Sequence, residues 1–482
     1  MKKNNRLYNP YPMNRRSLIQ YGALGLGGLA LNPMLMGKDL AAEEPHYLLV
    51  LFVRGGLDVS YLFDARSLDQ YKAKLQTNYF KSPQEPTLWT DARGGQTKVT
   101  SLVRPLAKWR PYFSVLNGVL MADNFDGHEQ NINFALTGNA FGGDWFAPYL
   151  NQKKQFSLDG ITFVGDIFAD FPTNGGGSIT LAPAALGELG QSASKAQKSV
   201  GVDPLIQQVA ARAAALGGPQ GSRPPGRLSQ GAQLMHQGIL DSLPFQKKIA
   251  QFRFDESDGI RGLLNASMEV YRAGITRTVA LSLDKLPDLV NFEFDVHGAE
   301  LTRRTPEMYG KVIEAVAAVF ETLHKTPYST NGKSFLDVTT VMLLSDFNRT
   351  TRQIGVDLDK SGTDHNPLSN TILLGGKGIR GNMIIGATDL DTLSGKTYAN
   401  VSPAHKNLDP ELIKIMGKPF DVKELKVLKT SPASYTRNQY LTFENVINTV
   451  FKAFRVTSKE QLRPYSGDRS GTAAPSLDKL LV

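Results

Sequence analysis

Continuous runs of apolar residues recur along the chain after residue 45, and they predict strands buried on both faces. The first run, Tyr47 to Val53, ends at Arg54-Gly55-Gly56. A run without polar alternation is typical of a strand inside a parallel sheet, so this strand is expected away from the sheet edge. Further strands, rich in β-branched residues, are predicted at residues 113–116, 276–283, 338–344, 370–374 and 383–385.

Apolar residues at helical spacing separate these runs. The clearest helix is predicted over residues 306–324, where Pro306 suits the first turn and the apolar positions are Met308, Val312, Ala315, Val316, Val319, Phe320 and Leu323. Residues 101–109 have a similar spacing, and another helix is expected to start at His128. Strands that alternate with helices predict an α/β fold with a mostly parallel central sheet and helices on both faces.

One domain is expected from about residue 46 to residue 464. Within it, residues 191–262 differ in composition, because Ala-rich and Gln-rich helical pieces flank a Gly/Pro-rich segment at 217–226. This stretch is interpreted as a helical and loop excursion rather than as a second domain. Residues 465–482 are rich in Ser, Gly and Pro and are predicted to form a C-terminal surface tail.

The first 42 residues have the three-part pattern of an export signal. Arg15-Arg16 precedes an apolar, Gly-rich segment at residues 21–31, and small residues follow at Ala41-Ala42. The paired arginines predict a twin-arginine signal peptide, with the Tat translocase as a partner and a periplasmic or secreted destination. Eleven apolar residues are too few for a stable membrane span. The alternative is a basic tail before a buried helix, but each glycine would cost that helix about 1 kcal/mol.

Composition and charge exclude several classes of protein. Hydrophobic residues form 41% of the 482 residues, which excludes a mainly disordered chain. The absence of cysteine excludes disulfides, Cys-ligated zinc, iron–sulfur clusters and thiol nucleophiles. The net charge is +9, of which +5 lies in residues 1–42. The small excess of positive charge in the remaining residues does not indicate a nucleic-acid-binding protein.

Polar residues that are able to do chemistry follow the predicted strands. In open α/β sheets ligands bind outside the carboxyl ends of the strands, so these residues are candidates for a site. Asp295 and His297 are two apart and would share one face of an extended segment. The full set of candidates is Arg54, Asp58, His128, Asp295, His297, Asp346 and His365.

Imidazole combined with carboxylate is a ligand set for zinc, iron or manganese. Each Asp/His pair alone is a weak signal, which a hydrogen-bonded surface loop explains better than a metal site does. The other histidines, His46, His236, His324 and His405, lack such neighbours and are interpreted as structural. No phosphate-binding loop, dinucleotide fingerprint or Gly-x-Ser-x-Gly motif occurs.

The order of the motifs resembles a known family. The motifs are Arg15-Arg16, residues 51–58, His128-Glu129 leading to Thr137-Gly138, Phe294-Asp295-Val296-His297-Gly298, residues 345–350 and Gly362-Thr363-Asp364-His365. Together they resemble the Tat-exported family called domain of unknown function 1501, which is grouped with the alkaline-phosphatase-like superfamily. The resemblance implies an alkaline-phosphatase-like sheet with a metal site at the strand ends.

The resemblance also implies roles for the candidate residues. Asp295, His297 and His365 match the ligands of one metal. Asp346 and Asp58 are the remaining carboxylates for a second metal, but Phe347 replaces its histidine and Arg54 replaces its first aspartate. One divalent ion, zinc, manganese or calcium, is therefore expected rather than two. Arg54 would hold a substrate anion. His128 lies where the sulfatase branch has its nucleophile and is predicted to be an acid/base, or a nucleophile that forms a phosphohistidine.

The leading hypothesis is thus an exported metal-dependent hydrolase of phosphate or sulfate esters. Its substrate would be a small anionic ester or a polysaccharide-derived one. The alternative is a non-catalytic exported protein whose degenerate metal site binds an anionic ligand or a partner. A third hypothesis, an exported redox enzyme, has only the leader in its favour. The first predicts that the candidate residues converge, with His297 and His365 within about 8 Å, several metal–nitrogen bond lengths.

Overall fold

The structure is a computed structural model. It describes residues 45–66, 86–122, 127–138, 147–151, 160–163, 178–181, 259–328, 332–350, 357, 360, 362–389, 416–429, 436–456, 462–465 and 471–482. The chain divides into two units, residues 1–40 with 186–252 and residues 41–185 with 253–482, and all described residues belong to the second unit. The predicted signal peptide and residues 191–258 of the predicted excursion lie outside the described residues.

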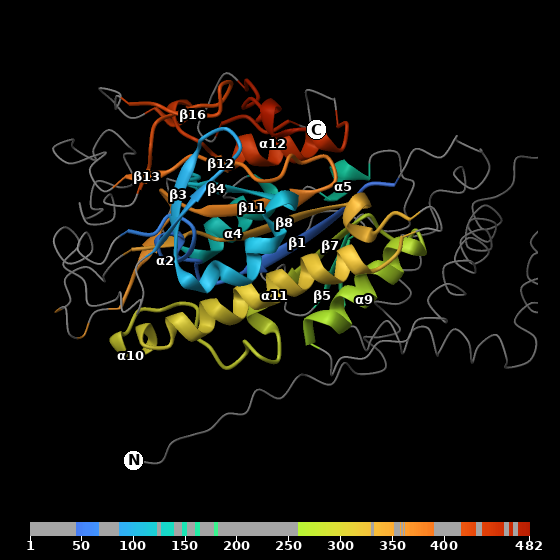
Figure 1. Cartoon of the computed structure of the whole chain (residues 1–482), viewed down its shortest axis with the longest axis horizontal. Helices are drawn as coiled ribbons and strands as arrows, with labels where there is room; N and C mark the ends of the chain where they lie inside the picture. Colours follow the sequence, from blue (N-terminus) through green and yellow to red (C-terminus); the bar gives the residue numbers. More distant parts are fainter. Residues whose placement is uncertain are drawn as a thin grey trace, which may run out of the picture. The chain divides into compact units, whose positions relative to one another are not determined.

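A central sheet of eight strands forms the middle of this unit (Figure 1). Its strand order is β12-β4-β11-β8-β1-β7-β5-β6. Every neighbouring pair is parallel except the two pairs that β11 makes with β8 and β4. The predicted α/β fold with a mostly parallel sheet is therefore confirmed. The strands are β1 (Tyr47–Val53), β4 (Phe113–Asn117), β5 (Gly160–Phe163), β6 (Ser178–Leu181), β7 (Thr278–Ser282), β8 (Thr339–Ser345), β11 (Thr371–Gly376) and β12 (Ile384–Ile385).

Strand β1 lies inside the sheet, as its unbroken apolar run predicts. It pairs with β7 on one side and with β8 on the other, so that Leu51 lies opposite both Leu281 and Leu343. All seven of its residues are buried. A strand with neighbours on both sides and helices on both faces has no solvent-facing position, which explains why no polar residue interrupts it.

Helices cover both faces of the sheet (Figure 1). Successive side chains of a strand point to opposite faces. On one face Tyr47 stacks on Tyr271 of α9 (Gly259–Arg272), with ring centroids 4.5 Å apart. On the other face Leu48, Val50 and Phe52 join a buried cluster with residues of α4 (His128–Thr137) and α12 (Phe443–Ala453). The long α11 (Thr305–Lys325), predicted from its apolar periodicity, packs beside α9.

The remaining elements are short. The expected helix at 101–109 is a 3-10 helix, η3 (Ser101–Tyr112), which contains Pro105 and Pro111. Because proline lacks an amide hydrogen, an α-helical hydrogen-bond ladder cannot run through these positions. The others are α2 (Val59–Leu62), α5 (Ala147–Leu150), α10 (Ala299–Thr302), η5 (Leu283–Lys285), η6 (Phe335–Val338), η10 (Arg437–Gln439), η11 (Asp478–Leu480), β2 (Thr87–Thr90), β3 (Gln96–Val99), β9 (Asn348–Arg349), β10 (His365–Asn366), β13 (Thr388–Asp389), β14 (Met416–Gly417), β15 (Phe420–Asp421) and β16 (Lys426–Val427).

The C-terminal residues differ from the predicted surface tail. In the segment 471–482, Leu477 and Leu480 are fully buried and belong to the core cluster of α4 and α12. The buried side chain of Asn448 in α12 donates to the backbone oxygens of Ala474 and Arg463, at 2.7 and 2.9 Å. The side-chain amide of Asn448 thus satisfies two carbonyl groups of the irregular C-terminal backbone. The segment therefore packs against the helix despite its polar composition.

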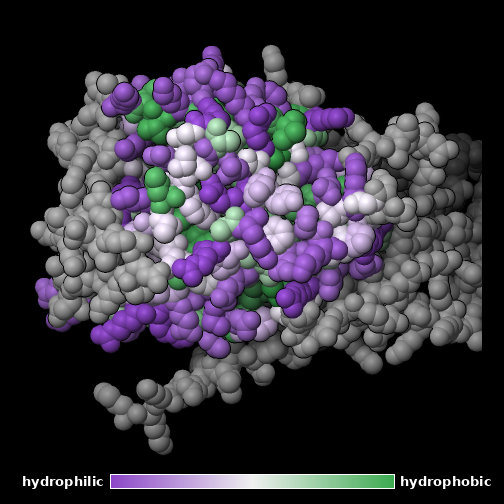
Figure 2. Space-filling model, in the orientation of Figure 1, coloured by the Kyte–Doolittle hydropathy of each residue, from purple (hydrophilic) through white to green (hydrophobic). Residues whose placement is uncertain are grey.

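The surface of the described residues is mostly polar. On the face that Figure 2 shows, apolar side chains form small separate patches among hydrophilic ones. Within the described ranges, no helix combines the length and the apolar character needed to cross a membrane.

Candidate functional site

The carboxyl ends of the central strands and the start of β11 meet at one edge of the sheet. Strands β1, β7 and β8 are parallel, so Val53, Ser282 and Ser345 end at this edge. Strand β11 runs in the opposite direction and therefore begins here, shortly after His365. The site is assembled from the loops at this edge and from the first residue of α4, His128.

One carboxylate oxygen lies at the centre of the site. Oδ1 of Asp295 is 2.9 Å from Nε2 of His297, 3.1 Å from Nε2 of His128 and 3.3 Å from Nε2 of His365. The Nε2 atoms of His297 and His365 are 3.1 Å apart. Nη1 of Arg349 donates to the same oxygen at 2.9 Å. The expected approach of His297 to His365 is therefore present, and three imidazoles surround one carboxylate.

A second carboxylate fixes one of these imidazoles. Oδ2 of the fully buried Asp346 is 2.6 Å from Nδ1 of His128 and accepts a hydrogen bond from the amide of Gly55 at 3.3 Å. Because the carboxylate accepts at Nδ1, that nitrogen carries a hydrogen, and Nε2 lies 3.1 Å from Oδ1 of Asp295 without the alignment of a hydrogen bond. Phe347 stacks against His365 and tilts against His128, with ring centroids 4.5 and 4.7 Å apart. The aromatic ring of Phe347 thus packs against two of the three imidazoles.

Two groups of side chains in the described ranges have the spacing of metal ligands. The first is His128, Asp295 and His365, and the second is His297, Asp364 and His365. In each group the donor atoms lie within 4.8 Å of one another. Asp364 is the weaker partner, since its Oδ1 is 3.8 Å from Nδ1 of His297. The sequence pattern marks Asp364 only as the neighbour of His365 and predicts no role for it.

Backbone hydrogen bonds join the segment that carries His297 to the segment that leads into His365. The amide of Thr363 donates to the oxygen of Val296 at 2.8 Å, and the amide of Gly362 donates to the oxygen of His297 at 3.2 Å. A Cβ atom on Gly362 would lie 2.3 Å from the backbone of His297, so only glycine fits there. This pairing explains why residues far apart in the sequence, such as Asp295 and His365, meet.

Arg349 is a component of the site that the sequence pattern does not predict. Its side chain is fully buried and, besides Asp295, contacts Thr363 through Nε at 2.9 Å and the oxygen of Gly55 through Nη1 at 3.3 Å. The feature that could have predicted this role is the position of Arg349 in β9, because β9 pairs with β10 and places Arg349 opposite His365. A strand of two residues is too short for the sequence to reveal that pairing.

Arg54 and Asp58 belong to neither ligand group. Asp58 is fully buried, and its amide donates to the hydroxyl of Tyr309 in α11 at 3.0 Å. The side chain of Arg54 is exposed, and its amide is 3.5 Å from Oδ1 of Asp284, an acid that follows β7 at the same edge. Of the seven residues singled out in the sequence, the structure therefore brings five together: His128, Asp295, His297, Asp346 and His365.

The electrostatic environment separates the pKa values of these groups. Burial alone would lower the pKa of His128, but its close approach to the Asp295 carboxylate and its hydrogen bond to Asp346 outweigh burial and raise the pKa to about 9. For Asp295, burial favours the neutral acid, but the hydrogen bonds from His128 and His365 and the charge of Arg349 hold its pKa far below the usual range. Burial and the Arg349 charge lower the pKa of His297.

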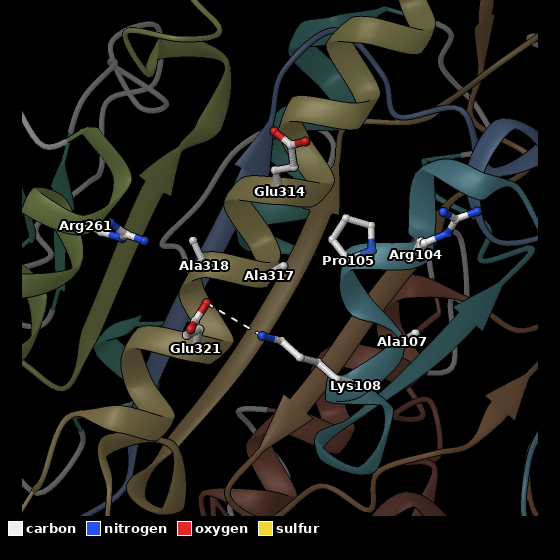
Figure 3. Close-up of a pocket in the computed structure, with 9 residues that line it drawn as sticks. All are labelled: Arg104, Pro105, Ala107, Lys108, Arg261, Glu314, Ala317, Ala318 and Glu321. Carbon is white, nitrogen blue, oxygen red and sulfur yellow. Dashed lines mark ion pairs between the residues drawn. The ribbon is translucent and has the colours of Figure 1, made fainter.

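A surface pocket of about 520 Å³ lies elsewhere, between η3 and α11 (Figure 3). Three cations, Arg104, Lys108 and Arg261, and two acids, Glu314 and Glu321, line it together with small side chains. Lys108 and Glu321 approach each other to 3.9 Å. The pocket contains none of the candidate residues, and its mixed charges select no class of ligand. The histidine cluster, formed by His128, His297 and His365 around Asp295, is therefore the candidate functional site.

Comparison with known proteins agrees with the resemblance in part. A family model described as "Protein of unknown function (DUF1501)" matches residues 262–409, an interval that contains Asp295, His297, Asp346 and His365. Among solved structures, the chain is similar to the crystal structure of a protein in the alkaline phosphatase superfamily from Vibrio parahaemolyticus, with 11% identity and a TM-score of 0.28 over 94% of this chain and 97% of that chain. No curated protein matches the sequence.

Proposed function

We propose that this chain is a metal-dependent hydrolase of phosphate or sulfate esters that the twin-arginine pathway exports to the periplasm or beyond. The observation that carries the proposal is the convergence of three imidazoles on one carboxylate at the carboxyl ends of the strands. Nε2 of His297, Nε2 of His365 and Oδ1 of Asp295 lie 2.9 to 3.3 Å from one another.

These donors fit a divalent ion. In a tetrahedral site with metal–ligand bonds of about 2.0–2.1 Å, neighbouring ligand atoms lie roughly 3.3 Å apart, close to the separations in the cluster. Nitrogen with one carboxylate oxygen suits zinc or manganese, whereas calcium prefers six to eight oxygen ligands. Asp295, His297 and His365 would therefore hold zinc or manganese rather than calcium.

The protonation states support this ligand set. The lowered pKa of Asp295 keeps its carboxylate ionised at neutral pH. The lowered pKa of His297 keeps that imidazole neutral, so its Nε2 lone pair is available to an ion. When bound, the ion would polarise the ester and lower the pKa of a water molecule, which is the chemistry that ester hydrolysis at neutral pH requires.

His128 is suited to act as the general acid. Asp346 holds its Nδ1, and Nε2 lies 3.1 Å from Oδ1 of Asp295. In the metal-free chain a pKa of about 9 keeps the ring protonated at neutral pH, and a protonated ring can give a proton to the leaving oxygen of the ester. Since both ring nitrogens already contact carboxylates, a covalent phosphohistidine is disfavoured, and water is the proposed nucleophile.

The substrate in this proposal is an ester with an exposed anionic group, either small or derived from a polysaccharide. The exposed Arg54 lies at the same edge of the sheet, one residue before Gly55, whose amide contacts Asp346. It is proposed to bind the phosphate or sulfate group of the substrate. Asp58 has no role in this proposal, because it is buried and outside both ligand groups.

Metal analysis combined with hydrolysis assays tests the proposal. Purified chain should contain zinc or manganese and hydrolyse members of a panel of aryl phosphates, phosphodiesters and aryl sulfates, and a chelator should abolish the activity reversibly. If the chain retains metal but hydrolyses no ester, the second candidate function applies: a protein that binds anions without catalysis. Phe347 and Arg54, at positions where the superfamily has metal ligands, favour that candidate. Calorimetric titration with phosphate and sulfate would test it.

Export is proposed from the leader alone. Arg15-Arg16, the Gly-rich apolar segment and Ala41-Ala42 have the order of a Tat signal. Exchange of Arg15-Arg16 for Lys-Lys should trap the chain in the cytoplasm, as fractionation would detect. Normal export of that variant would contradict the assignment.

A further inference from the structure

Arg349 is the most deeply buried cation beside the histidine cluster. None of its side chain is exposed, and all three guanidinium nitrogens donate to protein groups. The acceptors are Oδ1 of Asp295 at 2.9 Å, Oγ1 and O of Thr363 at 2.9 and 3.3 Å, and O of Gly55 at 3.3 Å. A charge this deeply buried costs free energy unless it is paired and hydrogen-bonded, and here both conditions are met.

These contacts join the three segments that form the site. Gly55 follows β1, Asp295 lies in the loop that carries His297, and Thr363 lies two residues before His365. Oγ1 of Thr363 in turn donates to the oxygen of Val296 at 2.8 Å, which connects the second and third segments. The guanidinium is planar and holds its donors in a fixed arrangement. It therefore fixes the position of the Asp295 carboxylate relative to His297 and His365.

The oxygens that a second metal ion would need are already in use. Oδ2 of Asp346 accepts from His128 and from the amide of Gly55, and Oδ1 accepts from the amide of Phe347 at 3.2 Å. Oδ1 of Asp295 accepts from Arg349 and is also the oxygen assigned to the first ion, so a second ion would have to share it. Phe347 covers two of the imidazoles with an apolar ring. A further divalent cation would also be repelled by the guanidinium, which neutralises one of the two carboxylates.

From this arrangement we infer that the guanidinium of Arg349 is a permanent positive charge in the proposed metal site. It positions Asp295 and supplies the positive charge that a second metal ion would otherwise bring, so the site binds one divalent ion per chain. The inference rests on the metal site of the proposed function, but it concerns the number and affinity of bound ions and does not depend on hydrolysis.

The test compares metal binding in the full chain and in matched variants. Each protein is stripped by chelation and reloaded with Zn²⁺, Mn²⁺ or Co²⁺, followed by elemental analysis, calorimetric titration and the visible spectrum of bound Co²⁺. The variants are Arg349→Met, Arg349→Lys and, as control, Arg277→Met. Arg277 precedes β7 at the opposite edge of the sheet and donates to the oxygens of His46 and Leu150 at 2.8 to 3.0 Å.

The unmodified chain should bind one ion. Arg349→Met should bind it roughly 10- to 100-fold more weakly, the range for loss of a group that orients a metal ligand, and with an altered Co²⁺ spectrum. Arg349→Lys retains the charge and should recover part of the affinity. Arg277→Met should lower thermal stability without changing affinity or spectrum.

Two bound ions in the unmodified chain would overturn the inference, as would unchanged affinity in Arg349→Met or an equal loss in Arg277→Met. If Arg349→Met does not fold, Arg349→Lys decides: an affinity equal to that of the unmodified chain contradicts the positioning role, and a weakened single ion supports it. A chain that binds one ion but hydrolyses no ester would refute the proposed function and leave this inference intact. Hydrolysis with two bound ions would do the reverse.

Discussion

Gly56 and Arg349 share a space that has room for only one side chain. A Cβ atom on Gly56 would lie 2.6 Å from Cδ of Arg349 and 3.2 Å from the ring of Phe347. Gly56 also has φ +93°, a conformation that side chains rarely adopt. The glycine pair after β1 therefore makes room for the buried arginine and the aromatic ring beside the histidine cluster.

Substitution of Gly56 by alanine should destabilise the chain through both strain and collision. The backbone conformation should cost about 1–2 kcal/mol. Displacement of Arg349 should add about 1–3 kcal/mol and weaken metal binding. Gly94 is the matched control, because its φ is +81° but a Cβ atom there would meet no other atom within 4 Å. Denaturant unfolding of Gly56→Ala and Gly94→Ala should separate the two costs, and equal losses would show that the contact with Arg349 is unimportant.

His365 is common to both ligand groups, so its removal should have the largest effect on metal binding. His365→Ala is expected to abolish metal retention while the fold remains, since the residue lies in the two-residue strand β10 and outside the core cluster. Elemental analysis and circular dichroism would measure the two properties. His324→Ala is the control, because that ring lies at the end of α11 beside Trp109. Metal content that survives in His365→Ala would contradict the proposed site.

The sequence predicts six of the eight strands of the sheet, because the physical signal for them is local, and it misses the short strands β5 and β6. Unbroken apolar runs mark strands that are buried on both faces, and β1, β7 and β8 all lie close to the predicted ranges. Local composition misleads where tertiary contacts decide. The segment 471–482 looks like a surface tail, but its backbone is satisfied by Asn448 of α12, which a composition argument does not include.

The candidate site is predicted less evenly. The rule that ligands collect at strand ends finds His128, Asp346 and His365 beside regular elements, and it also finds Asp295 and His297, which lie in a loop well after the end of β7. The rule does not show in which direction the chain turns after it leaves a strand. Asp58 follows β1 just as Asp346 follows β8, yet the turn at Gly55-Gly56 takes the chain toward Tyr309 of α11. Arg349 is missed because its importance comes from the contacts it makes across three segments.

The packed C-terminal segment leads to a stability prediction. Leu480 is fully buried in the core cluster, and the neighbouring Leu481 is only partly buried. Leu480→Ala should lower the free energy of unfolding by about 2–5 kcal/mol, the usual cost of a large-to-small core substitution. Leu481→Ala should cost distinctly less. A loss for Leu480→Ala below that for Leu481→Ala would support a loosely attached surface tail instead.

A buried histidine far from the cluster should make the chain sensitive to acid. Nε2 of His46 is 2.7 Å from Oγ1 of Thr340, and its ring stacks on Phe454 with centroids 3.8 Å apart. Burial, together with the charges of Lys377 and Arg277, lowers the pKa of His46 to about 3. The unfolded chain takes up this proton below about pH 6.5, whereas the folded chain does not until about pH 3. Stability should therefore fall as the pH drops through this window, by on the order of 5 kcal/mol.

His46→Gln separates this contribution from that of the carboxylates, because glutamine keeps an amide donor but does not titrate. Unfolding measured from pH 7 to pH 4 should show a shallower loss of stability for the variant than for the unmodified chain. Parallel curves would mean that His46 is not a neutral buried group in the folded chain.

The last prediction concerns Asp346 and the proton on His128. Against the effect of burial, the nearby carboxylates of Asp295 and Asp346 raise the pKa of His128 to about 9. The folded pKa exceeds the unfolded value, so this histidine stabilises the chain fully below about pH 6.5, by roughly 3 kcal/mol, and the contribution disappears as the pH rises through 9. Asp346→Asn removes one of the two negative charges and should lower the pKa of His128 by about one unit or more.

The chemical shifts of isotope-labelled histidine, followed by NMR as the pH of the metal-free chain is varied, would report the pKa of His128 directly. Stability between pH 7 and pH 9 should fall less steeply in Asp346→Asn than in the unmodified chain, because less of the proton-linked stabilisation remains to be lost. Asp364→Asn is the control, since Asp364 pairs with His297 at 3.8 Å and should leave the pKa of His128 unchanged. An unchanged pKa in Asp346→Asn would mean that Asp295 alone holds the proton, and the general acid would then depend on a metal ligand for its charge state.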